Sequence, residues 1–254
     1  MQKKSKLLGT LSIIGIMTLA GCKSHYEAVS ITPQRFEMTS AYDRTPNSID
    51  PVFSPYKQKI NQTMNTVIAQ SDMSMTAHRP QSILSNFVAD VLYDATLHYD
   101  PLIDFSVMNI GGIRAGMPKG NVTIGNMFEI SPFENIITIV ELKGSDVTEL
   151  FRNIASCGGE GISRHVRIEM TKNGKLVSAQ VGGKDIVPDR IYKIATIDYL
   201  AEGNDKLIAL RNATNKTYPE GTLLRDLLIE HMKKMTSEGK RISSKIDERL
   251  IIVK

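Results

Sequence analysis

The sequence predicts an α+β fold in which a mixed sheet is flanked by helices. Apolar residues recur at helical spacing in several separate stretches, which indicates helices that cover a core. Residues 166–181 alternate as a hairpin does, and their turn carries Asn173-Gly174, a pair preferred in type I′ turns. A hairpin beside separate helices favours α+β over a doubly wound parallel sheet.

The expected helices follow from apolar residues that share one helical face. They cover residues 56–69, 80–97, 144–156 and 223–235. The second stretch places Leu84, Val88 and Val91 on one face. Ser82 is the expected N-cap of that helix, with Ser85 as the alternative.

Short apolar runs bounded by loop residues predict the remaining strands. They are expected near residues 27–36 and at 103–108, 136–142 and 192–197. Residues 123–129 are expected to form only a short turn. The length and the apolar fraction are enough for one large domain, which we expect at residues 51–254.

Residues 1–21 have the layout of a secretory signal peptide. A basic start precedes an apolar stretch at residues 7–19, which is too short for a normal membrane span. Cys22 then follows Leu-Ala-Gly, which resembles the bacterial lipobox, whose cysteine is lipidated. We therefore expect a lipid anchor in the bacterial cell envelope, on the periplasmic or cell-surface side, with residues 22–50 as a tether and first strand. An ordinary signal peptide followed by an unrelated cysteine is the alternative.

The charge of the chain does not indicate a nucleic-acid-binding protein. The net charge of +4 falls to +1 when the three lysines of the expected signal, Lys3, Lys4 and Lys6, are removed. Because binding a polyanion needs a clustered basic surface, nucleic acid is not an expected partner. With Cys22 lipidated, Cys157 is the only thiol left, so no internal disulfide is expected. Cys157 lacks a Cys/His/Asn constellation, and we expect it to be inert.

The segment Asn109-Ile-Gly-Gly-Ile-Arg114 follows the apolar run at 103–108 and is the first candidate for a binding loop. Gly111 and Gly112 have no Cβ, so their backbone N–H groups can approach an anion closely. Asn109 adds side-chain donors and an acceptor, and Arg114 adds a fork of donors that suits phosphate or carboxylate. Taken alone, the motif is equally compatible with a plain turn.

Five short segments stand in one order along the chain. They are Arg79–Asp90, Asn109–Arg114, Pro132–Ile136, Leu142–Gly144 and Tyr192–Asp205. In residue pattern and spacing they resemble the C-terminal domain of the 5′-nucleotidase family, also called the UDP-sugar hydrolase family, over about residues 50–235. The resemblance implies the fold of that domain. It also implies that this domain binds the nucleotide rather than breaking its bond.

The resemblance implies a substrate-binding role for eight residues. They are Arg79, Asn109, Gly111, Gly112, Arg114, Phe133, Tyr199 and Asp205. Phe133 and Tyr199 would hold the base between two ring faces, with Tyr199 at a position where the family more often has Phe. Asp205 would accept hydrogen bonds from the ribose hydroxyls.

Two of these assignments depart from the family pattern. Arg114 and Asn109 match the positions that hold the phosphate and the base or sugar edge, whereas Arg79 competes with His78 for a second phosphate-binding position. The usual Gly-Gly-Asp-Gly of the family is here Gly203-Asn204-Asp205-Lys206, so this loop has lost two glycines. Asn tolerates positive φ better than most residues, which makes Asn204 an acceptable replacement.

Complete members of the family carry an N-terminal metallophosphoesterase domain whose two metal ions activate water. The five histidines form none of its metal-binding motifs, and we expect no room for that domain before Pro51. We therefore expect no catalytic residue, metal or cofactor in this chain, and divalent metals only in a separately encoded metallophosphoesterase partner.

Two other readings remain open. The chain is alternatively a non-catalytic surface lipoprotein that binds nucleotides or nucleosides for uptake. A retained scaffold with a decayed site is the third reading, and the survival of Asn109, Arg114, Phe133, Tyr199 and Asp205 together argues against it.

Overall fold

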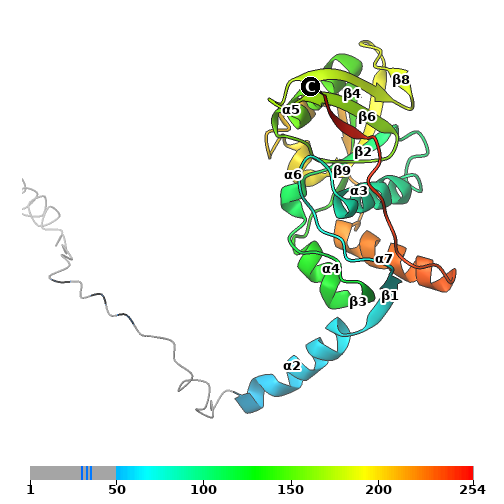
Figure 1. Ribbon diagram of the computed structural model, residues 1–254. Helices are drawn as coiled ribbons and strands as arrows, with labels where there is room; N and C mark the ends of the chain where they lie inside the picture. The colour runs from blue at the N-terminus through cyan, green and yellow to red at the C-terminus, as the bar shows by residue number, and fades with distance from the viewer. Residues whose placement is uncertain (1–29, 31–32, 34, 36–49, 254) are drawn as a thin grey trace, which may run out of the picture. The chain divides into compact units, whose positions relative to one another are not determined.

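The computed structural model describes residues 30, 33, 35 and 50–253 (Figure 1). The chain divides into two units, Met1–Asp50 and Pro51–Lys254, and the sheets described below belong to the second unit. The expected signal peptide and Cys22 lie outside the described residues, and so does nearly all of the strand expected at 27–36. Within the described part of the chain, no helix has both the length and the apolarity that a bilayer span requires.

A five-stranded mixed sheet forms the centre of this unit. Its strands stand in the order β10 (Asn215–Thr217), β4 (Ile137–Lys143), β9 (Ile191–Ile197), β2 (Phe105–Met108) and β5 (Gly161–Ile162). β2 and β9 run parallel, and the other neighbouring pairs run antiparallel. All residues of β2 are buried, as expected for a strand covered on both faces. The three strands expected around this sheet are confirmed.

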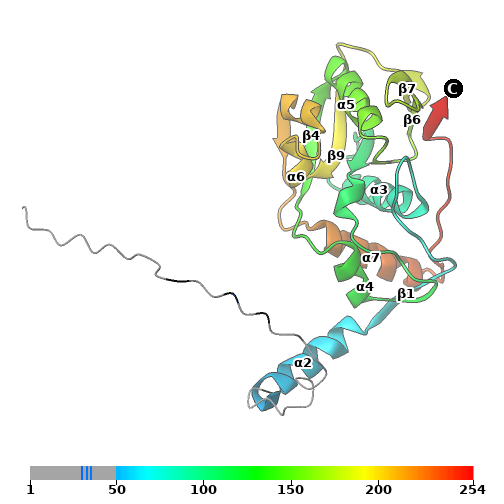
Figure 2. The ribbon, with the colours of Figure 1, turned by 60° about the vertical axis from the view of Figure 1, so that its left-hand side comes forward.

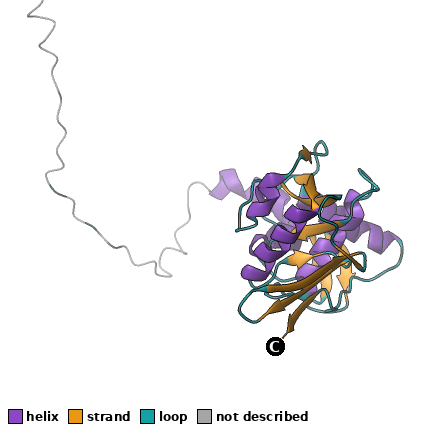
Figure 3. Cartoon of the chain, turned by 90° about the horizontal axis from the view of Figure 1, so that it is seen from above, coloured by secondary structure: helices purple, strands orange, loops and turns teal. Residues whose placement is uncertain are grey.

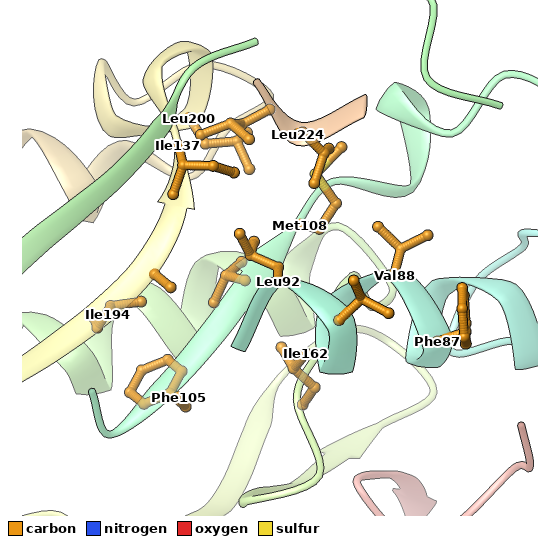
Figure 4. Packing of buried hydrophobic residues seen from close by; sticks show 14 of the residues in the cluster. Phe87, Val88, Leu92, Phe105, Met108, Ile137, Ile162, Ile194, Leu200 and Leu224 are labelled. Carbon is orange, nitrogen blue, oxygen red and sulfur yellow. The ribbon is translucent and has the colours of Figure 1, made fainter. Parts of the chain in front are cut away.

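Helices α3 (Ile83–Thr96) and α5 (Gly144–Ser156) cover opposite faces of this sheet. The Phe105 ring lies 5.4 Å from the Phe151 ring of α5, whereas the Ser106 hydroxyl donates to the Ala89 carbonyl of α3 at 2.6 Å. Successive residues of a strand point to opposite faces, so the two helices sandwich β2. Leu92 of α3 lies among the side chains that fill the space between this helix and the sheet (Figure 4).

The start of α3 shows why both candidate caps were plausible. The Ser82 hydroxyl accepts from the Ser85 backbone N–H at 3.2 Å, and the Ser85 hydroxyl accepts from the Ser82 backbone N–H at 3.0 Å. This is a reciprocal capping box. The N-cap expected at Ser82 is confirmed, and Ser85 assists it rather than replacing it.

A second sheet is built on the expected hairpin. It has the order β11 (Leu250–Val253), β6 (Val166–Thr171), β7 (Leu176–Val181) and β8 (Lys184–Asp185), with β11 at one edge (Figure 3). The hairpin is confirmed, but its turn is not type I′, because Gly174 has a positive φ and Asn173 does not. Thr171 N–H bonds Lys175 O and Gly174 N–H bonds Thr171 O, which makes a three-residue loop that ends in the left-handed glycine.

A small antiparallel pair, β1 (Val67–Ser71) and β3 (Gly120–Thr123), lies with α4 (Ile124–Ile130) and α7 (Leu224–Ser237) at the opposite end of the unit from the four-stranded sheet (Figures 1 and 2). The expected last helix is confirmed as α7. Two other expectations were wrong. The helix expected at 56–69 is α2 (Asp50–Met64), which ends earlier than expected. Residues 67–69 of the expected helix belong to β1 instead, because their pairing with β3 buries Ile68. The turn expected at 123–129 is α4, which Thr123 caps together with Asn126.

The loop after α6 (Asp198–Ala201) has an unusual backbone. Gly203, Asp205 and Lys206 have φ values of 75°, 51° and 66°, whereas Asn204 has no positive φ. The left-handed conformation crowds the Cβ of an L-residue, so the strain falls on Asp205 and Lys206 rather than on Asn204, the expected position.

Replacing Lys206 with glycine should therefore stabilise the fold by about 1 kcal/mol, because the left-handed penalty exceeds the entropy that glycine adds to the unfolded chain. Lys206 is exposed, so little packing is lost. Lys206→Ala is the matched control, since it removes the same side chain but keeps the Cβ. Urea unfolding of both variants measures the difference. Equal stabilities for the two variants would contradict this account of the loop.

Candidate functional site

The strand pairing brings four loops to one edge of the central sheet. β2 and β9 are parallel neighbours, so the segments that follow Met108 and Ile197 leave the sheet at the same edge. β4 is antiparallel to β9, with Ile137 paired to Ile197, so the loop before β4 arrives there as well. Gly161 pairs with Met108, which adds the loop before β5. Ligand sites of open α/β sheets lie at such carboxyl ends of parallel strands.

A pocket of about 400 Å³ opens between three of these loops, those that follow β2 and β9 and the one that leads into β4. It is lined by Asn109, Gly111, Gly112, Arg114, Phe133, Asn135, Tyr199 and Asp205. Seven of the eight residues expected to bind substrate thus lie around one pocket. Its volume is within the range of small-molecule sites, which is about 300–1,000 Å³.

The two expected stacking rings line this pocket and remain half-exposed. Phe133 is 48% exposed and Tyr199 is 43% exposed, whereas aromatic rings that serve only the core, such as Phe105, are buried completely. Phe133 lies in the loop that leads into β4, and Tyr199 is in the first turn of α6. Each residue therefore keeps surface at the pocket that a planar ligand could cover.

Asp205 lies at the centre of a small hydrogen-bond network. Its Oδ1 accepts from the Tyr199 hydroxyl at 2.9 Å, and its Oδ2 accepts from the Asn109 Nδ2 at 2.5 Å. Its carbonyl oxygen faces the Cys157 Sγ at 3.7 Å. The bond to Asp205 raises the pKa of the Tyr199 hydroxyl, which therefore stays protonated as a donor.

The glycine loop, residues 109–114, needs its glycines because neighbouring atoms leave little room for a Cβ, and not because of positive φ values. A Cβ on Gly112 would lie 2.7 Å from the Asn109 Oδ1, and one on Gly111 would lie 3.4 Å from the Asp205 Oδ2. Gly112 N–H bonds Asn109 O inside the short 3₁₀ turn η2 (Ile110–Gly112), so this N–H is not free to meet an anion as the sequence suggested. Arg114 is exposed at the end of the loop, with Nη1 donating to Gly111 O at 3.1 Å.

The Asn109 side chain is buried and only partly paired. The residue is 3% exposed, and its Oδ1 finds no hydrogen-bond partner among the described residues. Buried side-chain oxygens are nearly always paired, so this unpaired oxygen, on a residue that lines the pocket, is an exception.

Arg79 is not among the residues that line the pocket. Its guanidinium donates to the Gly159 carbonyl at 2.9 Å and to the Glu160 carboxylate, whose other oxygen accepts from the Ile110 N–H at 2.6 Å. Glu160 is completely buried, and this burial raises the pKa of its carboxyl group. Arg79 therefore supports the glycine loop indirectly, through Glu160 and its bond to the Ile110 N–H. Direct contact of Arg79 with phosphate stays a prediction.

Three supporting residues were missed from the sequence. Asn135 lines the pocket two positions after Phe133, within the same motif, so the motif itself could have revealed it. Glu160 lies in a Gly-Gly-Glu-Gly run that gave no chemical signal. Arg225 of α7 is buried and donates to the carbonyls of Ser131 and Pro132 at 3.3 Å, which fixes the loop that carries Phe133.

Cys157 lies next to the backbone of Asp205. Burial is the main cause that raises the pKa of its thiol, and the nearby Glu160 carboxylate adds to it. A raised thiol pKa lowers the thiolate fraction, so the structure gives Cys157 no reactive character. Among the described residues, no group of three or more His, Cys, Asp or Glu side chains is placed to hold a metal ion.

Residues 59–212 match the protein family described as "5′-nucleotidase, C-terminal domain". The 5′-nucleotidase of Vibrio vulnificus is 27% identical over 186 residues, which cover 68% of this chain and 32% of that protein. This chain thus spans about a third of the length of that relative.

Solved structures agree in fold. A 5′-nucleotidase precursor from Thermus thermophilus aligns with a TM-score of 0.68 at 20% identity, over 80% of this chain and 43% of that one. The NAD nucleotidase of Haemophilus influenzae aligns with a TM-score of 0.62 at 19% identity, over 81% of this chain and 41% of that one. The family match covers more than half of the sequence and includes every residue that lines the pocket. This chain belongs to the 5′-nucleotidase C-terminal domain family.

Proposed function

We propose that this protein is the nucleotide-recognition part of a 5′-nucleotidase-type phosphohydrolase, and that a separately encoded metallophosphoesterase breaks the phosphate ester bond. The observation that best supports the proposal is the grouping of Phe133, Tyr199 and Asp205 around one pocket. A nucleoside has a flat base and two adjacent ribose hydroxyls. The two half-exposed rings suit the base, and the carboxylate beside them suits the hydroxyls.

In the proposed complex, four pocket residues contact the three parts of the nucleotide. The base stacks against Phe133 and Tyr199, which recognises its flat shape without selecting one particular base. The ribose hydroxyls donate to Asp205. The 5′-phosphate lies toward Arg114, the cation of the pocket lining, whose planar fork of donors suits phosphate.

The chemistry of the lining residues supports binding more than hydrolysis. An arginine can stabilise charge on a phosphate, but without a metal ion or a nucleophile such a site would be a poor phosphatase. The described residues do not fit a metal ion, so we assign no catalytic step to this chain. In this proposal the divalent metals belong to the partner, and a lipid at Cys22 keeps the recognition domain in the bacterial cell envelope.

Calorimetry on residues 23–254 with AMP and adenosine tests the proposal, followed by a phosphate-release assay of the same sample with added manganese. Binding without release is the expected result. Release by this chain alone would contradict the assignment of hydrolysis to a partner. Failure of every nucleotide and nucleoside to bind would overturn the recognition role itself.

Arg114→Ala should weaken AMP binding by about 10- to 100-fold and leave adenosine binding nearly unchanged. The reason is that a charge-assisted hydrogen bond to phosphate contributes about 1.5–3 kcal/mol. Arg152→Ala, an exposed arginine on α5, is the matched control for the loss of one positive charge. Equal losses for AMP and adenosine would rule out a phosphate role for Arg114.

Phe133→Ala should weaken AMP and adenosine alike, by ~1–3 kcal/mol, because base stacking on an aromatic ring is worth about that much. Phe53→Ala removes an exposed phenylalanine from α2 and serves as the control. Isothermal calorimetry gives the affinities, and thermal melting verifies that both variants fold. If the folded Phe133→Ala protein binds as tightly as the wild type, Phe133 is not part of the site.

A further inference from the structure

The Tyr199 hydroxyl makes a contact that a phenylalanine could not make. It donates to the Asp205 Oδ1 at 2.9 Å, while the Asn109 Nδ2 donates to the Oδ2 of the same carboxylate at 2.5 Å. Asp205 is thus held at both oxygens, by one side chain from the first turn of α6 and one from the loop after β2. The carboxylate cannot turn about its Cβ–Cγ bond without breaking both hydrogen bonds.

The two bonds leave a defined capacity for a ligand. An ionised carboxylate has about four lone-pair positions, two on each oxygen. The protein fills one position on each oxygen, so one acceptor position remains on each. Two donors held side by side, as in the vicinal hydroxyls of ribose, match this arrangement.

The surrounding structure keeps the carboxylate in place. Asp205 has a positive φ of 51°, and its carbonyl oxygen is met by the Cys157 thiol. The Asn204 side chain donates to the Tyr199 carbonyl at 2.8 Å, which ties this loop to the start of α6. Tyr199 therefore presents its ring to the pocket while its hydroxyl and its backbone both hold the loop that carries Asp205.

We propose that the Tyr199 hydroxyl determines sugar specificity: by fixing Asp205, it makes the pocket select ribonucleotides over 2′-deoxyribonucleotides. This inference rests on the proposed nucleotide-binding function. A fixed carboxylate cannot turn toward a single hydroxyl, so a 2′-deoxy ligand leaves one desolvated acceptor without a partner. Sites built to hydrogen-bond a hydroxyl reject ligands that lack it for this reason.

Without the tyrosine hydroxyl, the carboxylate gains freedom. Its Oδ1 can then turn toward the remaining 3′-hydroxyl or toward water, and the missing 2′-hydroxyl costs less. The aromatic ring of a phenylalanine still stacks on the base. Tyr199→Phe should therefore lower the discrimination between the two sugars while it keeps base binding.

The test is the ratio of dissociation constants for 2′-deoxyAMP and AMP, measured by calorimetry on residues 23–254. We expect a ratio of about tenfold in the wild type, from the loss of one hydrogen bond to a charged group. In Tyr199→Phe we expect the ratio to fall at least about threefold. Tyr218→Phe, at an exposed tyrosine outside the pocket lining, should keep the wild-type ratio. Phe133→Ala should weaken both ligands equally and also keep it.

The outcomes separate this inference from the proposed function. If the wild type binds neither nucleotide, the proposed function fails. If the wild type binds AMP and Tyr199→Phe shows an unchanged ratio, only the specificity role of the hydroxyl fails. A wild type that binds AMP and 2′-deoxyAMP equally would also overturn that role. Tyr199 is half-exposed, so its conservative replacement should fold, and thermal melting of the variant verifies this.

Discussion

The parallel pairing of β2 with β9 is the constraint on which the candidate site depends. The paired residues Phe105 and Ile194 are 89 positions apart, and their pairing brings the loops that follow the two strands to the same place. A one-residue slip in register would turn the buried side chains of β2 toward the wrong helix. The wrong register would cost the core contacts of Phe105 with α5 and the bond of Ser106 to α3. The core therefore fixes the register, and the register fixes where Asn109 and Tyr199 emerge.

Buried polar contacts then hold the loops of the pocket in the places where the sheet puts them. Glu160 is removed from water completely, and its two partners, Arg79 and the Ile110 N–H, compensate for that burial. The buried Arg225 donates to the carbonyls of Ser131 and Pro132 and so holds the loop that carries Phe133. The strained backbone at Asp205 is tolerated because neighbouring side chains hold the loop from several sides. Rigid support behind a pocket reduces the ordering cost of binding, which suits a domain whose proposed task is recognition.

Part of this molecule could be predicted from sequence because the signals are local. Helical periodicity identified α3, α5 and α7, and the family pattern identified seven residues that line one pocket. The rest depends on distant partners. Val67 and Ile68 continue the helical spacing of the segment before them, and only pairing with β3 makes them a strand. β11 pairs in parallel with β6, 82 positions away between Leu250 and Ile168, and nothing within its own residues indicates that partner. Glu160 looks like a loop residue in the sequence because its burial results entirely from the tertiary fold.

The central claim is that the pocket at the edge of the five-stranded sheet holds a nucleotide. A crystal structure of residues 23–254 with AMP tests it most directly. We expect the base to lie between Phe133 and Tyr199, both ribose hydroxyls to lie within hydrogen-bond distance of Asp205, and the phosphate to face Arg114. A nucleotide bound elsewhere, for instance in the cavity of about 560 Å³ beside Arg249, with the Phe133 pocket left empty, would contradict the account.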